Sequence, residues 1–279
     1  MKKSKKPLWI ALLIVCLLIA AAGAVYLWLS MGGRQVSRDD FTPSQTQETQ
    51  IGTGDEPTAA LTETPPTQEP SINTFGYELA DPGDFDVDFD QLESVNRDIY
   101  AWLYVPGTDV DYPVVCSTSN GDDSFYLNHN IYRQYQFSGS VYSELKNRRD
   151  MSDPVTVLYG HNMLNGSMFA SLHRFEDAQF FNKNTTAFLF TEDKVYTYLI
   201  YAAYDFDDRH ILNSYHLDDE DGLTDYLEST LNPHSYNANV RKGVELNTDD
   251  RILVLSTCTN GAANTRYLVQ GVLVNEQEK

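Results

Sequence analysis

An uninterrupted apolar run near the N-terminus does most to constrain what this chain can fold into. Residues 8–29 carry no charged side chain. As a helix they would extend for about 33 Å, enough to cross a bilayer core of roughly 30 Å. Four lysines precede the run, namely Lys2, Lys3, Lys5 and Lys6. By the positive-inside rule they hold residues 1–7 in the cytoplasm, so we predict a single-pass signal anchor at 8–29 with the rest of the chain outside the cell.

A cleavable signal peptide is the alternative interpretation of the same run. Ala20, Ala22 and Ala24 provide the small residues that signal peptidase cleavage sites need. The apolar region of a signal peptide is usually about 7–15 residues long, whereas this run continues past the alanines. The length therefore favours an uncleaved anchor, and under either interpretation the C-terminal part is exported.

Composition divides the exported part into two segments. Thr, Pro, Gln and Glu dominate residues 39–74, which contain few large apolar side chains, so residues 30–74 are predicted to be a disordered extracellular stalk. The folded domain is expected at 75–279. Six of the 20 basic residues precede Asp39 and all 40 acidic residues lie from Asp39 onward, so this part carries a net charge of −26. Such a surface repels phosphate backbones, which excludes a nucleic-acid partner.

Hydrophobic patterning in the folded domain predicts a mainly β structure with a few helices. Apolar spacing indicates an opening amphipathic helix over 89–102 and a later helix over 218–231. The acidic start of the later helix suits the positive end of a helix dipole, and we prefer this to a calcium site. Short β-rich runs predict strands at 108–115, 138–142, 155–159, 251–257 and 267–274 and a hairpin over 186–206. Many short strands favour a barrel.

Three residues capable of catalysis stand at the ends of predicted strands. Cys258 follows the apolar strand that starts at residue 252, and His161 follows strand 155–159 after a glycine. Arg266 begins the next strand, where antiparallel pairing would bring its charge beside Cys258 to favour a thiolate and bind an oxyanion. Each residue also fits a structural role, as an inert thiol, a surface histidine or a solvent-reaching arginine. Surface loops are likewise expected for most of the other five histidines, which are His129, His173, His210, His216 and His234.

Taken together, these motifs resemble the sortases. The sequence LSTCT at 255–259, the sequence YGHNM at 159–163 and Arg266 carry the resemblance, which covers about residues 96–274. The opening helix, the GSMF sequence at 166–169 and the helix before the cysteine strand are similar to class B. The resemblance implies an eight-stranded β-barrel with an N-terminal helix and an inserted helix. It also implies a membrane-anchored cysteine transpeptidase on a Gram-positive cell surface.

The resemblance implies a reaction as well. Cys258 would attack the Thr carbonyl of a C-terminal sorting motif in a secreted protein and form a thioester, with His161 as acid and base and Arg266 on the oxyanion. Ser256, Leu127 and Thr259 are implied in substrate binding, with the loop 205–214 along the groove. The acceptor amine would come from a peptidoglycan precursor, giving cell-wall anchoring, or from a pilin lysine, giving pilus assembly. This chemistry needs no metal or cofactor.

Other classes of protein remain open at this stage. An L,D-transpeptidase places an arginine two residues after its cysteine, and papain-like enzymes place the cysteine before the histidine, so both fit poorly. Cys116 departs from the sortase pattern, which more often has a polar residue there. A non-enzymatic stalked adhesin locked by a Cys116–Cys258 disulfide is therefore the alternative of a different class.

Overall fold

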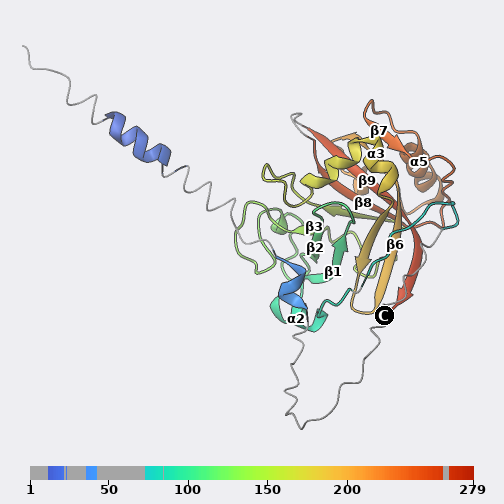
Figure 1. Cartoon of the computed structure of the whole chain (residues 1–279), viewed down its shortest axis with the longest axis horizontal. Helices are drawn as coiled ribbons and strands as arrows, with labels where there is room; N and C mark the ends of the chain where they lie inside the picture. The colour runs from blue at the N-terminus through green and yellow to red at the C-terminus, as the bar shows by residue number, and fades with distance from the viewer. Residues whose placement is uncertain (1–11, 22, 24–35, 43–72, 84, 260–263) are drawn as a thin grey trace, which may run out of the picture.

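The structure is a computed structural model that describes residues 12–21, 23, 36–42, 73–83, 85–259 and 264–279. Its strands are β1 (Ile99–Tyr104), β2 (Asp111–Cys116), β3 (Val141–Ser143), β4 (Val155–Tyr159), β5 (Thr186–Phe190), β6 (Lys194–Asp207), β7 (Ala238–Val240), β8 (Ile252–Cys258) and β9 (Thr265–Glu278). Its helices are η1 (Arg38–Phe41), α2 (Phe89–Val95), η2 (Phe125–Leu127), η3 (Ala170–Glu176), α3 (Ala178–Lys183), α4 (Ile211–Ser214) and α5 (Glu220–Leu231). Figure 1 shows α2 and η1 at one end of the sheet and α3, α5 and β7 at the other.

The sheet closes into the predicted eight-stranded barrel. Hydrogen-bonded neighbours follow the order β5-β1-β2-β3-β4-β8-β9-β6, and β5 pairs with β6 to complete the circuit. The 14 residues of β6 make this closure possible, because its first half pairs with β5 and its second half pairs with β7. β7 is thus a ninth strand that lies beyond the barrel. Closure leaves few free strand edges in the described chain.

Alternation along each strand separates the barrel interior from an outer core. On β8, Leu253 and Leu255 belong to the inner cluster, whereas Ile252 and Val254 belong to the outer one. Helix α5 covers the outer core with its buried residues Leu223, Tyr226 and Leu227. Asp219 caps α5 by accepting a hydrogen bond from the Gly222 amide at 2.7 Å, which confirms an acidic helix start at this position. By the same alternation, Cys258 points to the outer side of the barrel.

The opening helix is shorter than its apolar spacing predicts. Helix α2 ends at Val95, and the expected helical positions Ile99 and Trp102 lie in β1, where both are buried. Asn96 has an extended backbone and uses its side chain on distant groups, donating to the Tyr126 hydroxyl at 2.7 Å. The helix ends before Asn96 because the side chain of this residue forms hydrogen bonds with groups outside the helix. The residues that follow have high β-propensity and join the sheet.

Part of the predicted stalk packs against the barrel. Arg38 donates to both carboxylate oxygens of Asp111 at 2.9 Å, and Trp102 Nε1 donates to the same carboxylate at 2.6 Å. The Phe41 side chain is buried at 2% exposure in the cluster around Trp102. The prediction of a disordered segment is therefore wrong for residues 36–42, because Arg38 and Phe41 find partners that a composition average cannot reveal. Residues 30–35 and 43–72 lie outside the described part of the chain.

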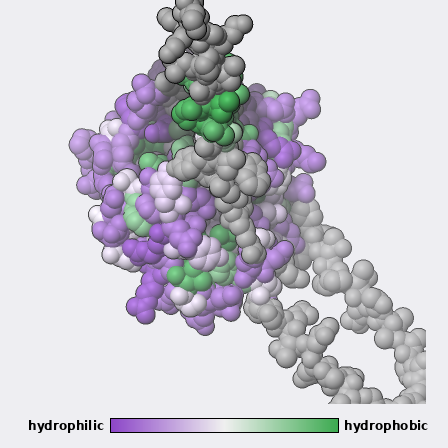
Figure 2. Space-filling view, turned by 90° about the vertical axis from the view of Figure 1, so that its left-hand side faces the viewer, coloured by the Kyte–Doolittle hydropathy of each residue, from purple (hydrophilic) through white to green (hydrophobic). Residues whose placement is uncertain are grey.

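The predicted anchor at 8–29 is described only in part. Residues 12–21 and 23 are helical, and the remaining positions lie outside the described residues. Within the described chain, no helix is both long enough and apolar enough to cross a membrane. Figure 2 shows one face of the molecule, on which hydrophilic residues predominate and hydrophobic areas are separate.

Candidate active site

Parallel pairing of β4 and β8 brings the predicted histidine and cysteine to one end of the barrel. The register pairs Tyr159 with Ser256, and the Gly160 amide donates to the Ser256 carbonyl at 3.2 Å. His161 and Cys258 each lie two residues beyond the Tyr159–Ser256 pair, at the carboxyl ends of adjacent parallel strands. The two residues therefore share one end and one side of the barrel.

Antiparallel pairing of β8 and β9 adds the arginine to this end. Cys258 and Arg266 are direct cross-strand partners, and Arg266 Nη1 donates to Cys258 Sγ at 2.9 Å. Cys258 is exposed and is a free thiol. A guanidinium in contact with sulfur favours the negatively charged thiolate, which is the nucleophilic form of cysteine. The arrangement can therefore support nucleophilic chemistry at Cys258.

His161 is oriented by the main chain of a neighbouring loop. Its Nε2 lies 2.7 Å from the Leu127 carbonyl oxygen, which can only accept a hydrogen bond, so Nε2 carries the proton. Phe137 stacks on the imidazole with a centroid distance of 5.7 Å. In the described structure the imidazole thus bonds to Leu127 and makes no hydrogen bond to Cys258. Nδ1 remains as the nitrogen that can exchange a proton with a substrate.

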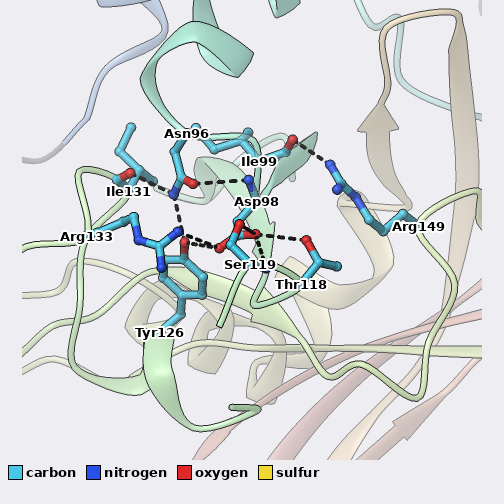
Figure 3. A network of polar contacts seen from close by, with 9 residues as sticks. All are labelled: Asn96, Asp98, Ile99, Thr118, Ser119, Tyr126, Ile131, Arg133 and Arg149. Carbon is cyan, nitrogen blue, oxygen red and sulfur yellow. Dashed lines mark hydrogen bonds and ion pairs between the residues drawn. The ribbon is translucent and has the colours of Figure 1, made fainter. Parts of the chain in front are cut away.

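A buried carboxylate holds the loop that carries Leu127. Figure 3 shows Asp98 at the centre of this network. The Asp98 side chain is fully buried. Asp98 Oδ1 accepts from the Ser119 amide at 2.9 Å and from the Thr118 hydroxyl at 2.8 Å, and Oδ2 accepts from the Tyr126 hydroxyl at 2.8 Å. Burial alone would raise the pKa of Asp98, but the hydrogen bonds from Ser119, Tyr126 and Thr118 outweigh it and the pKa is lowered.

This network connects the start of β1 with the site histidine. Tyr126 is fully buried and precedes Leu127 in η2. The hydrogen bond from Tyr126 to Asp98 therefore fixes the segment whose Leu127 carbonyl accepts a hydrogen bond from His161. Arg133 adds an ion pair to Asp98 at 3.5 Å from the same loop. Sequence reasoning missed Asp98, although an acidic residue directly before a strongly apolar strand is an unusual pattern that could have drawn attention to it.

The predicted substrate-binding residues occupy different environments. Leu127 is 43% exposed beside His161, whereas Ser256 is only 3% exposed within β8. The Thr259 amide donates to the Thr265 carbonyl at 3.2 Å, so this amide can bind a substrate only if that bond breaks. In the loop 205–214, His210 Nε2 and Glu144 Oε1 lie 2.7 Å apart, which fixes the loop against the residue that follows β3.

Cys116 does not pair with Cys258. It is a free cysteine, buried at 1% exposure at the end of β2. Strands β3 and β4 lie between β2 and β8, which separates the two cysteine strands by about 14 Å at roughly 4.8 Å per step. A disulfide requires Cα atoms within about 7 Å of each other. The disulfide on which the adhesin alternative depends is therefore absent.

His173 is a second residue whose contacts sequence reasoning missed. A surface loop was the expectation for most histidines other than His161, but the His173 side chain is only 9% exposed and lies against the main chain of Cys258. Its Nε2 is 2.9 Å from the Cys258 carbonyl oxygen and its Nδ1 is 2.5 Å from Glu176 Oε1. The spacing of three residues between His173 and Glu176 on one helix is the signal that could have linked them.

Comparison with known proteins gives one consistent result. The family model for the sortase domain matches residues 103–274. Sortase B of Listeria monocytogenes is 30% identical over 187 residues, which cover 66% of this chain and 73% of that protein. A mutant form of Clostridium perfringens sortase B has 32% identity and a TM-score of 0.60, covering 67% of this chain and 86% of that one. The Staphylococcus aureus sortase B–substrate complex shares the fold, with 24% identity, a TM-score of 0.58 and coverage of 67% and 84%. The chain therefore belongs to the sortase family of cysteine transpeptidases, as a member of class B.

Proposed function

We propose that Cys258, His161 and Arg266 are the catalytic residues of this transpeptidase. The single observation that carries the proposal is the 2.9 Å contact between Arg266 Nη1 and Cys258 Sγ on directly paired strand ends. A thiolate beside a fixed cation is a competent nucleophile for an acyl group. The same guanidinium lies where it can bind the oxygen of a tetrahedral intermediate.

The proposed reaction has two acyl transfers. The Cys258 thiolate attacks the carbonyl carbon of a Thr residue, forming a C–S bond while the carbonyl electron pair moves to oxygen, where Arg266 stabilises the charge. Collapse of this intermediate breaks the C–N bond, and the leaving amine takes a proton from His161. An acceptor amine then attacks the thioester and returns a proton to His161. The C–S bond breaks and restores the thiolate, so atoms and charge balance without a cofactor.

The hydrogen bond to Leu127 assigns different tasks to the two nitrogens of His161. Nε2–H stays on the Leu127 carbonyl throughout, which keeps the ring in place. Nδ1 gives its proton to the leaving amine and later accepts one from the incoming amine. Fixing one nitrogen on the main chain leaves a single site for proton exchange and therefore a defined direction for transfer.

The proposed substrates are secreted proteins that carry a C-terminal sorting motif cleaved after Thr, with a peptidoglycan precursor as the amine acceptor. The N-terminal lysines and the apolar run at 8–29 support this, because they have the pattern of a single-pass anchor that would hold the C-terminal domain outside the cell. Staphylococcus aureus sortase B, which shares this fold, forms a complex with a substrate, and this likewise supports a substrate-binding site in this chain.

A peptide panel tests the proposal directly. The chain is incubated with N-P-x-T-x and L-P-x-T-G peptides and hydroxylamine, and the products are read by mass spectrometry with Cys258→Ala as control. We expect cleavage after Thr in one motif and none in the control. Adding a wall-type branch peptide or a pilin lysine peptide in place of hydroxylamine then distinguishes wall anchoring from pilus assembly. Equal cleavage by Cys258→Ala would contradict the proposal.

A further inference from the structure

The main-chain carbonyl of Cys258 lies just beyond the end of a strand ladder. The last ladder bond between β4 and β8 runs from the Gly160 amide to the Ser256 carbonyl. Carbonyls two residues apart on a strand point to the same side, so the Cys258 carbonyl points toward β4 where β4 has already ended. Strand pairing with β4 therefore cannot satisfy this carbonyl, and another group must hold it.

Two side chains take the place of the missing strand. Asn162 Nδ2 donates to the Cys258 carbonyl at 3.0 Å, and His173 Nε2 lies 2.9 Å from the same oxygen. The two residues reach it from different segments, since Asn162 follows His161 and His173 belongs to η3. Among the described contacts, the Cys258 carbonyl is thus hydrogen-bonded by two side chains and by no backbone group.

The imidazole of His173 is held on three sides. Its Nδ1 lies 2.5 Å from Glu176 Oε1, and its ring stacks on Tyr267 with a centroid distance of 4.8 Å. The side chain is 9% exposed. Nδ1 faces the Glu176 carboxylate, and Nε2 faces the Cys258 carbonyl oxygen with the Asn162 amide nitrogen 3.1 Å away. Because a carbonyl oxygen can only accept, the bond to Cys258 requires the proton on Nε2. A ring held in this way presents Nε2–H to Cys258 in one fixed direction.

The titratable groups around His173 come from η3 and from the paired strands β6, β8 and β9. Tyr267 is the cross-strand partner of both Thr257 and Asp205, in the row adjacent to the one that contains Cys258 and Arg266. Burial raises the pKa of Asp205, and nearby Glu176 raises it further. The groups near His173 are thus Glu176, whose side chain is 38% exposed, Asp205 and Tyr267, while Cys258 contacts it through the main-chain carbonyl.

We propose that His173, held by Glu176, is a positioning residue that fixes the Cys258 carbonyl and thereby keeps Cys258 Sγ beside Arg266. The orientation of the carbonyl sets the backbone angle ψ of Cys258. Loss of the His173 bond leaves Asn162 as the remaining side-chain donor, so the peptide next to the sulfur is less firmly held. A displacement of about 1 Å in a reacting group can cost about 10²-fold in rate. This inference rests on the proposed role of Cys258 as the nucleophile.

The test compares two substitutions that separate hydrogen bonding from packing. His173→Phe keeps a ring that can stack on Tyr267 but removes both hydrogen bonds, whereas His173→Gln keeps an amide that can reach the Cys258 carbonyl. His234→Phe is the matched control, because His234 is exposed and lies outside the proposed machinery. Each variant of the full chain is studied in detergent micelles for melting temperature, peptide turnover and the pH dependence of Cys258 alkylation, resolved by peptide mapping.

We expect His173→Phe to move the half-maximal alkylation of Cys258 to higher pH by about one unit and to lower kcat by about 10- to 100-fold with KM within about twofold. His173→Gln should recover most of both properties, and His234→Phe should match the wild type. A wild-type profile in His173→Phe, or an equal loss in His173→Gln, would overturn the inference.

If His173→Phe does not fold, Glu176→Gln replaces it. We then expect kcat to be about three- to tenfold lower, and an unchanged kcat would overturn the inference. Failure of the catalytic proposal would appear separately, as turnover by Cys258→Ala.

Discussion

At the scale of single residues, surroundings rather than residue type decide chemistry in this molecule. Cys258 is exposed beside a guanidinium, whereas Cys116 is buried, and burial raises the pKa of the Cys116 thiol. One nitrogen of His161 bonds to the Leu127 carbonyl, while His173 is 9% exposed and bonds to the main-chain carbonyl of Cys258. Two cysteines and two histidines thus occupy contrasting surroundings, which is the basis for proposing a reactive role for Cys258 and His161 only.

Substitution of Arg266 tests the contact on which the catalytic proposal depends. Arg266→Ala should lower kcat by about 10²- to 10³-fold, because it removes both the cation beside Sγ and a donor to the oxyanion. Arg266→Lys should be intermediate, since an ammonium keeps the charge but not the fork of donors. Arg97→Ala is the control, because that side chain is 85% exposed. Turnover is measured on variants with unchanged melting temperature, and a fully active Arg266→Ala would contradict the assignment.

Asp98 should contribute to stability in a pH-dependent way. Asp98→Asn replaces a fully buried, hydrogen-bonded carboxylate and should lower the free energy of unfolding by about 1–3 kcal/mol at pH 7. The folded pKa of Asp98 is lowered, so its stabilisation is present above the unfolded value of about 4 and is lost as pH falls through the folded pKa. The difference between wild type and variant should therefore shrink below about pH 4.

Chemical denaturation between pH 3 and pH 8 measures this effect. The matched control is Asp225→Asn, an exposed position on α5 whose substitution should change the free energy of unfolding by less than about 0.5 kcal/mol. A difference between wild type and Asp98→Asn that stays constant over the whole range would show that the charge of Asp98 is not what stabilises the fold.

At the scale of secondary-structure elements, sequence patterns predicted two kinds of element correctly. One kind pairs with a partner close in sequence, and the other contains a long apolar run. The hairpin β5–β6 and strands β4, β8 and β9 appear where alternation and apolar runs indicate them, as does helix α5. The helix over 89–102 fails at Asn96, because Tyr126 and Ile131, which its side chain contacts, are 30 and 35 residues away. A helical period read over a β-rich stretch could not reveal those contacts.

The segment 36–42 supplies an element-scale prediction. Phe41→Ala should lower the free energy of unfolding by about 2 kcal/mol, because it empties a site packed against Trp102. This is less than a full core deletion, since the segment can detach locally while the barrel stays folded. Hydrogen exchange should accelerate at the Asp88 amide, which donates to the Phe41 carbonyl at 2.8 Å. Phe137→Ala, an exposed aromatic at 51%, is the control for stability, and equal losses in the two variants would contradict docking of this segment.

At the scale of the whole molecule, barrel closure makes the site. Cys258, His161 and Arg266 come from three strands that are consecutive in the sheet order, although 97 residues separate His161 from Cys258 in the chain. Strand-end patterns with the family motifs were sufficient to predict that these three residues lie at one end of the barrel. They were not sufficient for Asp98 and His173, whose roles depend on contacts 28 and 85 residues away. Such contacts exist only once the barrel has closed.

The arrangement of strands also predicts how the two cysteines of the domain react. In the native full chain, alkylation mapped by mass spectrometry should modify Cys258 readily and Cys116 at least about 100-fold more slowly. Cys116 is protected because β2 must leave the barrel before its sulfur reaches solvent, so denaturant should equalise the two rates. A non-reduced peptide that links Cys116 to Cys258 would contradict both the strand order and the catalytic proposal. The adhesin interpretation requires that peptide, so one experiment separates a structural bridge from a reactive thiol.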